Sequence, residues 1–366
     1  MVMDRYPSRL KRLRSLMRKA GLPSLLVSHT SNVTYLTGFT GDSSYLWVGS
    51  SEEILISDGR YTTQLEEECP GLRVHLRKVG ERMASATSTA LAAVKPATIG
   101  IEAGTMTVAV RDELAEKLPK AALAAAADLV EQLRQIKDKE EIASIRVAVE
   151  QAERAFRLVS AGVRGDATEK QIADQFEAAL RHFGATGSCF PPIIAAGARS
   201  ALPHARASEA SIAGAEFVLI DWGARNGLYV SDLTRLWVTA KISPKLERVY
   251  RVVFEANRAA IAAIRPGATA QQIDAVARGV IHDAGFGANF THGLGHGIGL
   301  DVHEEPRLSS TNQRPLEPGM VLTIEPGVYL PGWGGVRLED DVLVTKSGAE
   351  VLSTLPKSLE SMTLNL

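Results

Sequence analysis

The spacing of apolar side chains predicts alternating helices and strands along the first third of the chain. Between residues 5 and 19, leucines and a methionine recur at the spacing of one helical face, and Gly21 ends the run. Short β-rich runs follow, such as Ser24–Val27 and Glu53–Ser57, with helical stretches between them. This alternation predicts a small α/β domain over residues 1–133.

The remainder, residues 134–366, contains an internal repeat with a period of 101 positions. Residues 163–184 and 264–285 carry identical or similar residues at seven equivalent positions. These include a Thr where a helix should begin and a Gly where it should end. Each copy follows another helical stretch and precedes β-rich sequence. The repeat predicts two similar α/β halves that face each other around one pocket. The alternative is chance recurrence of helices that start at Thr and stop at Gly.

Composition excludes several classes of protein and partner. Basic and acidic side chains number 41 and 42, which gives no reason to expect a nucleic acid or an anionic membrane as partner. No run reaches the roughly 20 apolar residues of a transmembrane helix. The two cysteines, Cys69 and Cys189, fall in different predicted domains, so we expect no disulfide and a cytoplasmic location.

The segment Val218–Asp232 reads as a β-hairpin. Two β-rich runs flank Asn226 and Gly227, the strongest short-range hairpin signal. If these two residues form the loop, pairing proceeds at a constant index sum of 453, and Asp221 lies directly opposite Asp232 on one face. Two carboxylates so placed repel each other, and burying them unpaired is costly. We therefore expect a cation between them.

A second hairpin repeats this arrangement with glutamates. The runs Val321–Pro326 and Val336–Glu339 flank a Gly-rich turn, and Glu325 and Glu339 are equidistant from Gly332. A loop of odd length would place the two carboxylates opposite each other. A register slip of one residue would instead turn one Glu to the other face of the sheet.

Between the hairpins lies a segment rich in glycine and histidine, Thr291–Pro306. Its glycines argue against a helix and for backbone that passes close to a ligand. Together with the four acids, His296 completes an oxygen-rich ligand set that suits Mn²⁺ or Co²⁺ and tolerates Zn²⁺ or Fe²⁺. Two bridged ions would make a dinuclear hydrolase site. Taken one at a time, each acid also reads as an ordinary solvated strand residue.

These segments in combination resemble the creatinase/aminopeptidase P/prolidase group of pita-bread metallopeptidases. The matching pieces are Leu219–Gly223, Asp232–Arg235, His292–Gly299, Thr323–Gly327 and Val336–Asp340. The resemblance implies an α+β chain. A pita-bread catalytic domain of two pseudo-symmetric α/β halves would occupy residues 134–366, and a smaller creatinase-like α/β domain would occupy residues 1–133.

The resemblance also implies roles for individual residues. Two divalent ions, with manganese favoured and cobalt or zinc as alternatives, would be bound by Asp221, Asp232, His296, Glu325 and Glu339. In the family pattern Asp232 and Glu339 bridge the ions. Three imidazoles would contact the substrate and the tetrahedral intermediate, namely His204, His292 and His303.

Other residues are candidates for proton transfer and for recognition of proline. Glu325 is our candidate to carry a proton to the leaving imino nitrogen. His292 and Arg337 are candidate walls of a proline pocket, and Arg337 alternatively pairs Glu339 or Asp340.

The upstream domain bears on which relative the chain resembles most. Asn32–Phe39 and Ser57–Tyr61 look like the N-terminal domain of Xaa-Pro aminopeptidases, although Asp42–Tyr45 departs from the usual small-residue pattern. We therefore expect a Xaa-Pro aminopeptidase that acts on peptides with proline at the second position. The family resemblance also implies a homodimer.

Three other functions stay open from the residues. A Xaa-Pro dipeptidase must also recognise the free carboxylate that follows proline, usually with a cation. A non-catalytic binding protein of the same fold would be expected to have lost metal ligands. A two-metal phosphatase would need a basic phosphate clamp around the site.

Overall fold

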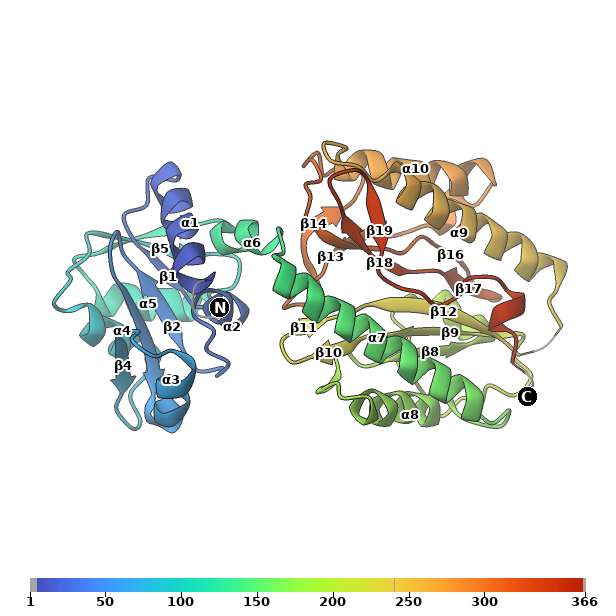
Figure 1. Ribbon diagram of the computed structural model, residues 1–366, viewed down its shortest axis with the longest axis horizontal. Coiled ribbons are helices and arrows are strands. Elements are labelled where there is room, and N and C mark those ends of the chain that lie inside the picture. The colour runs from blue at the N-terminus through green and yellow to red at the C-terminus, as the bar shows by residue number, and fades with distance from the viewer. Residues whose placement is uncertain (1–4, 240, 365–366) are drawn as a thin grey trace. The chain divides into compact units, whose positions relative to one another are not determined.

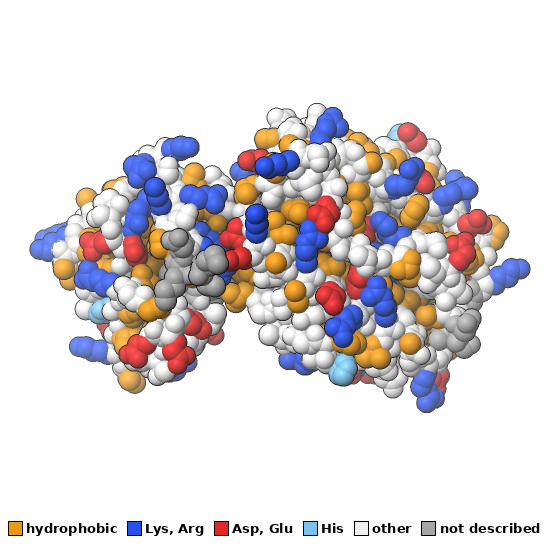
Figure 2. Space-filling view, viewed as in Figure 1, with side chains coloured by type: hydrophobic (Ala, Val, Ile, Leu, Met, Phe, Trp, Pro, Cys, Tyr) orange, Lys and Arg blue, Asp and Glu red, His pale blue; other side chains and the backbone are white. Residues whose placement is uncertain are grey.

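The computed structural model describes residues 5–239 and 241–364, and the chain divides into two compact units, Met1–Arg134 and Gln135–Leu366 (Figure 1). Among these residues, no helix is both long and apolar enough to span a membrane. Figure 2 shows that basic and acidic side chains both occur on the visible face of each unit.

The N-terminal unit is built on one mixed sheet of six strands in the order β4-β3-β2-β1-β5-β6. Strand β1 pairs antiparallel with β2 and parallel with β5. The strands are β1 (Leu25–Val27), β2 (Tyr45–Val48), β3 (Glu53–Asp58), β4 (Val74–Arg77), β5 (Thr98–Glu102) and β6 (Ala122–Ala126). The helices are α1 (Arg5–Lys19), α2 (Thr30–Thr37), α3 (Thr62–Glu68), α4 (Met83–Leu91), α5 (Val108–Lys117) and α6 (Leu129–Arg134).

Strand β6 consists mostly of alanine, which by itself favours a helix. It is a strand because its backbone pairs in parallel register with β5 along the whole of Thr98–Glu102. Here sheet pairing outweighs intrinsic propensity.

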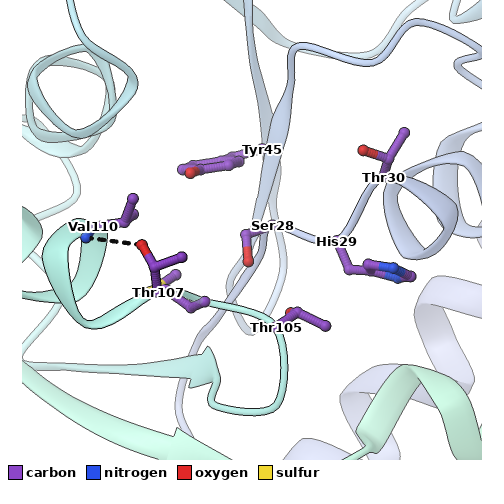
Figure 3. A pocket seen from close by; sticks show the side chains of 8 residues that line it. Ser28, His29, Thr30, Tyr45, Thr105, Thr107 and Val110 are labelled. Atoms are coloured by element: carbon purple, nitrogen blue, oxygen red, sulfur yellow. Dashed lines mark hydrogen bonds between the residues drawn. The ribbon is translucent and has the colours of Figure 1, made fainter.

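A cavity of about 200 Å³ opens in the N-terminal unit near the carboxyl end of β1 (Figure 3). The backbone N–H groups of Ser28 and His29 donate to Glu102 Oε2 at 2.5 and 2.7 Å. Thr107 accepts from the backbone N–H of Val110 at 3.3 Å and so caps α5. These hydrogen bonds hold the loop after β1 to the end of β5 and cap the first turn of α5.

The C-terminal unit contains two helix pairs, one for each copy of the sequence repeat (Figure 1). The first pair is α7 (Lys139–Gly162) and α8 (Glu169–His182), and the second is α9 (Pro244–Ala263) and α10 (Ala270–Asp283). Helices α8 and α10 each have 14 residues. Their first residues lie 101 positions apart, which is the period of the repeat.

The ends of these two helices explain the repeated residues. Thr168 and Thr269 are N-caps, and each forms a capping box with a Gln three positions later. Beyond the helices, Gly184 and Gly285 have φ values of 92° and 87°, a left-handed conformation that glycine adopts without strain. The expected pair of similar α/β halves is therefore confirmed.

Each helix pair packs against strands of the C-terminal unit. Phe156 of α7 and Phe176 of α8 pack on Trp222 and Trp237 in one core. A second core joins apolar side chains of α9 and α10 to those of β15, β17 and β18. The sheets have the orders β12-β9-β8, β11-β10-β7, β14-β13-β15-β18-β19 and β16-β17.

The strands of this unit are mostly short. They are β7 (Gly187–Ser188), β8 (Ile193–Ala196), β9 (Phe217–Trp222), β10 (Ala224–Asn226), β11 (Tyr229–Val230), β12 (Leu233–Val238), β13 (Gly295–Gly297), β14 (Glu304–Leu308), β15 (Val321–Ile324), β16 (Gly327–Leu330), β17 (Gly334–Arg337), β18 (Asp340–Val344) and β19 (Ala349–Val351).

Candidate metal centre

The aspartate hairpin forms, but its register differs from the predicted one. Asp221 lies opposite Thr234, so Asp232 is displaced by two positions from the expected partner. The loop consists of Gly227 and Leu228, and Gly227 has a φ of 57°, as a type II′ turn requires at its first loop position. The prediction of direct opposition is therefore wrong. Because the shift is even, the alternation of the strands still places both acids on one face.

The glutamate hairpin has the predicted register. Ile324 pairs with Asp340 in β15 and β18, and Gly327 pairs with Arg337 in β16 and β17. Both pairings have the same index sum, which places Glu325 opposite Glu339 in the gap between the two strand pairs. The loop has three residues, Pro331–Trp333, so its length is odd as expected.

The candidate ligands converge inside the C-terminal unit. One ligand atom each of Asp232, His296 and Glu339 lies within 4.8 Å of the others. His296 Nε2 is 3.3 Å from Glu325 Oε1 and 3.8 Å from Asp232 Oδ2. Asp221 lies close enough to this group for its charge to raise the pKa of both Asp232 and Glu339.

Burial makes this concentration of acids unfavourable without a cation. It raises the pKa of Asp232 and of Glu339 well above the usual range, and neighbouring carboxylates raise both further. Burial also acts to raise the pKa of Glu325, but the hydrogen bond and charge of His296 outweigh it and lower that pKa to about 2. Asp221 Oδ1 is buried without a hydrogen-bond partner among the described residues.

These observations fit a divalent metal site. Orphaned buried oxygen atoms are costly, and a cation placed among the carboxylates would satisfy them and cancel their repulsion. The donor set of carboxylate oxygens and one imidazole nitrogen suits hard or borderline divalent ions and includes no thiolate.

Arg337 supports this centre instead of pairing with Glu339 or Asp340. Its Nη2 donates to Asp221 Oδ2 at 2.5 Å, and its Nε donates to Thr234 Oγ1 at 3.1 Å. Thr234 Oγ1 in turn donates to Glu339 Oε2 at 2.6 Å. The alternative that Arg337 pairs Glu339 or Asp340 is therefore wrong.

His292 is held on both ring nitrogens. Its Nδ1 is 2.7 Å from the carbonyl of Gly293, which can only accept, so this nitrogen carries the hydrogen. Its Nε2 is 2.9 Å from the hydroxyl of Tyr329, which accepts from Arg337 Nη1 at 2.8 Å. Burial lowers the pKa of His292, so the ring is neutral and its Nε2 accepts from the Tyr329 hydroxyl.

The other two predicted imidazoles lie at the edge of the centre. The ring of His303 contacts that of His296 edge to face, with 4.4 Å between centroids. Burial and the charge of His296 lower the pKa of His303 to about 4. His204 is exposed on the loop after the short 3₁₀ helix Gly197–Ala201, and its charge acts on Asp221 and His303.

The glycines of the central segment serve chain packing. A Cβ at Gly295 would lie 2.1 Å from the carbonyl oxygen of Thr323, and one at Gly297 would lie 2.3 Å from that of Glu305. We expected the backbone here to pass close to a ligand. The backbone also passes close to neighbouring strands, and these contacts bring His296 to the two acid pairs.

The motif at Ser57–Tyr61 also has a local structural role. The Asp58 carboxylate accepts from the backbone and side chain of Arg60 and from Arg77. The hydrogen bond from Arg60 keeps the pKa of Asp58 well below its usual range, although burial opposes it. The motif therefore closes the turn after β3.

Sequence reasoning missed Thr234 and Tyr329. Thr234 lies within the matched segment Asp232–Arg235, so the resemblance contained a signal for it. Tyr329 follows Glu325 by four residues and Gly327 by two, and alternation along the strand would have offered it as a candidate on the same face.

A cluster of buried acids around one imidazole, set between two similar α/β halves, is a ligand set of the kind that metal-dependent hydrolases use. The chain belongs to metallopeptidase family M24, which matches residues 143–346, and residues 9–136 match the creatinase/prolidase N-terminal domain. It is a metallo-exopeptidase with the pita-bread fold expected from the sequence.

Relatives match the chain along almost its whole length. The Xaa-Pro dipeptidase of Pyrococcus furiosus is 35% identical over 352 residues, which are 96% of this chain and 99% of that protein. The solved Xaa-Pro dipeptidase of Bacillus anthracis has a TM-score of 0.94 at 34% identity and covers 98% of this chain and 100% of its own. The X-Pro aminopeptidase of Thermotoga maritima MSB8 has a TM-score of 0.85 at 35% identity, with 93% and 98% covered.

Proposed function

We propose that this chain is a metal-dependent Xaa-Pro dipeptidase, which hydrolyses the bond between an N-terminal residue and a C-terminal proline. The carrying observation is the similarity to Xaa-Pro dipeptidases over nearly the full length of both chains, with a TM-score of 0.94 for one of them. The comparisons thus support the dipeptidase better than the aminopeptidase expected from the sequence. Because the chain is also similar to the X-Pro aminopeptidase of Thermotoga maritima MSB8, an aminopeptidase is the second candidate function.

Residues 134–366 would form the catalytic domain, and residues 1–133 would form the creatinase-like domain. Two divalent ions would be held by Asp221, Asp232, His296, Glu325 and Glu339, with manganese favoured and cobalt or zinc as alternatives. When bound, such ions make hydroxide available near neutral pH, where free water does not supply it.

The side chains around the ligands would keep this centre in one geometry. Arg337 fixes the carboxylate of Asp221, and Thr234 fixes that of Glu339. Glu325 is ionised at neutral pH and can accept a proton and pass it to the imino nitrogen that leaves.

The three imidazoles would face the substrate. Neutral His303 and exposed His204 can donate a hydrogen bond to the carbonyl oxygen as negative charge develops there. Both nitrogens of His292 are already engaged, so we assign it to the wall of the proline pocket.

A dipeptidase also needs a cation for the carboxylate of proline. Arg337 is occupied by Asp221, Thr234 and Tyr329. Arg307 is exposed on β14, and its charge lowers the pKa of His303, so it lies within electrostatic reach of that imidazole. We assign the carboxylate to Arg307.

The deciding experiment compares hydrolysis of a Xaa-Pro dipeptide with that of the matching Xaa-Pro-Xaa tripeptide by the manganese-loaded protein. The dipeptidase proposal expects a higher kcat/KM on the dipeptide. A clear preference for the tripeptide would establish the aminopeptidase instead. The homodimer and the cytoplasmic location stay predictions. Measurement of the molecular mass in solution by light scattering tests the homodimer.

A further inference from the structure

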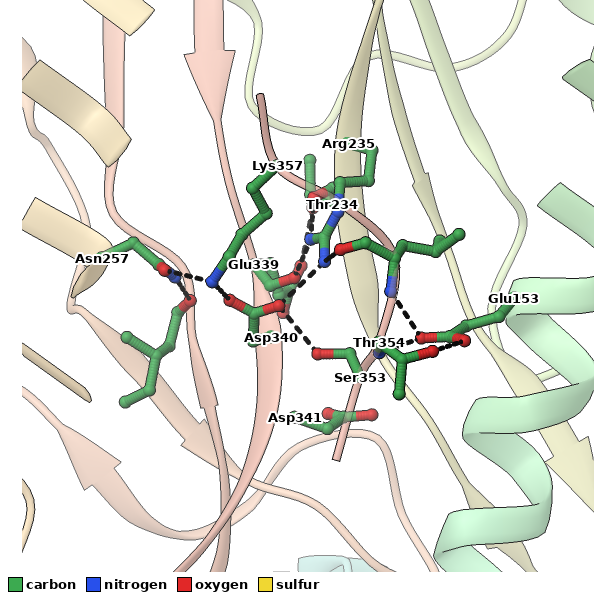
Figure 4. A network of polar contacts seen from close by, with 12 residues as sticks. Glu153, Thr234, Arg235, Asn257, Glu339, Asp340, Asp341, Ser353, Thr354 and Lys357 are labelled. Atoms are coloured by element: carbon green, nitrogen blue, oxygen red, sulfur yellow. Dashed lines mark hydrogen bonds and ion pairs between the residues drawn. The ribbon is translucent and has the colours of Figure 1, made fainter. Parts of the chain in front are cut away.

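A network of polar contacts in the C-terminal unit joins Arg235, Asp340 and Lys357 (Figure 4). The side chains of Arg235 and Asp340 are fully buried, and Arg235 Nη2 donates to Asp340 Oδ1 at 2.9 Å. Lys357 Nζ donates to the other carboxylate oxygen, Asp340 Oδ2, at 2.6 Å. Asp340 therefore joins two cations that come from distant parts of the chain.

One end of this network reaches the backbone of Glu339. Arg235 Nη1 donates to the carbonyl oxygen of Glu339 at 2.6 Å and to that of Thr234 at 3.0 Å. The guanidinium is planar and carries its donors in a fixed fork, so it fixes the direction of the Glu339 carbonyl. The peptide group next to one candidate ligand is thereby tied to Asp340.

The other end reaches the backbone beside Glu325. Lys357 Nζ donates to Asn257 Oδ1 at 2.9 Å, and Asn257 Nδ2 donates to the carbonyl oxygen of Ile324 at 3.0 Å. Ile324 directly precedes Glu325. A continuous chain of hydrogen bonds thus links the peptide groups at the two opposed glutamates.

The segment that supplies Lys357 is itself anchored. The backbone carbonyl of Lys357 accepts from the Tyr250 hydroxyl at 2.8 Å, and the backbone carbonyl of Leu355 accepts from Arg235 Nη2 at 3.1 Å. Ser353 Oγ donates to Asp340 Oδ1 at 2.7 Å. The segment lies outside the strands, so these contacts and not a sheet ladder place the ammonium group.

We propose that Lys357 is a positioning residue for the metal centre, acting through Asp340 and Asn257 on the backbone that carries Glu339 and Glu325. The inference rests on the proposed function in taking these two glutamates as metal ligands. Their carboxylates repel each other across the hairpin, so each backbone must be held for both to point at the ions. Outer hydrogen-bond partners of this kind orient ligands and tune metal affinity.

The test measures Mn²⁺ affinity of the metal-free full-length protein by calorimetry, which needs no turnover. Lys357→Met keeps the aliphatic stem but removes the charge and should weaken Mn²⁺ binding on the order of 10- to 100-fold. Asn257→Ala should have a similar effect, and the double variant should lose little more, because both act in one chain of contacts. Lys357→Arg retains a cation beside Asp340 and should recover most of the affinity.

The matched control is Arg146→Met, which removes a cation from the exposed pair with Glu350 at 2.8 Å. It should bind Mn²⁺ as the unaltered protein does. Equal Mn²⁺ affinity in Lys357→Met and Asn257→Ala, whether or not their melting temperatures fall, would overturn the positioning role. If the unaltered protein itself neither bound Mn²⁺ nor cleaved Xaa-Pro peptides, the proposed function would fail instead.

Discussion

At the scale of single residues, the centre is governed by the cost of burying acids. Glu339 is buried, and burial together with neighbouring carboxylates raises its pKa. Glu339→Gln keeps the size of the side chain and an oxygen that can accept from Thr234, but it removes the charge that would attract a metal ion. We expect metal occupancy to be lost and kcat/KM to fall by about 1000-fold, since a metal contributes several kcal/mol to the transition state. Metal analysis and kinetics on the folded variant check this, and a metal-free variant with full activity would refute it.

Arg307 offers a second prediction at this scale, which concerns substrate length. Arg307→Ala should lower kcat/KM on a Xaa-Pro dipeptide by 10- to 100-fold, because a charged hydrogen bond contributes about 1.5–3 kcal/mol. Hydrolysis of a tripeptide should change much less, because its carboxylate lies one residue further on. Arg258→Ala, which removes an exposed arginine paired with Glu255, is the control. Equal losses on both substrates would exclude the carboxylate role.

The residue types of the site could be proposed from the sequence, but most of their partners could not. Carboxylates and a glycine-flanked imidazole have an identifiable metal chemistry wherever they stand. The contact of Arg337 with Asp221 spans 116 positions, and that of Thr234 with Glu339 spans 105. No local pattern encodes such a pairing, and this is why the alternative role considered for Arg337 was a pairing with the nearer acids Glu339 or Asp340.

At the scale of elements, turn chemistry decided which register could be predicted. In the aspartate hairpin, Gly227 takes the first loop position instead of the second, which shifts the pairing by two residues. In the glutamate hairpin, symmetry about Gly332 was sufficient, because one register continues through both strand pairs. Helix boundaries in the repeat were predictable since Thr caps and Gly stops act within a few residues.

The close packing of β13 leads to a prediction about a single methyl group. Gly295→Ala would place a Cβ against the backbone of Thr323, which cannot move without breaking the strand pairing. We expect a loss of about 1–3 kcal/mol in the free energy of unfolding and weaker Mn²⁺ binding, because His296 is the next residue. Gly279→Ala is the control: it lies inside α10 with open space around it, so alanine should stabilise by about 0.5–1 kcal/mol. Denaturant titration measures both, and equal stability of Gly295→Ala would contradict the steric reading.

At the scale of the whole molecule, the architecture was more predictable than the substrate. The repeat of helices predicted two similar α/β halves, and the alternating upstream region predicted a small α/β domain. The family resemblance then implied an α+β chain with a pita-bread catalytic part. The choice between a dipeptide and a longer peptide depends on the residues that close the pocket beyond proline. These residues are few, and they form no sequence motif that would identify them.

The confinement of all five candidate ligands to one unit gives a prediction about how metal stabilises the molecule. A ligand that binds only the folded state adds about 2.7 kcal/mol when its concentration is 100 times its Kd. Adding Mn²⁺ to the metal-free protein should therefore slow hydrogen exchange in β9, β12, β15 and β18, which hold or flank the ligands. The strands β2 and β3 carry none of these residues and should exchange at unchanged rates. Mass spectrometry of exchanged peptides distinguishes the two sets, and slowing that extended equally to β2 and β3 would show that the two units unfold together.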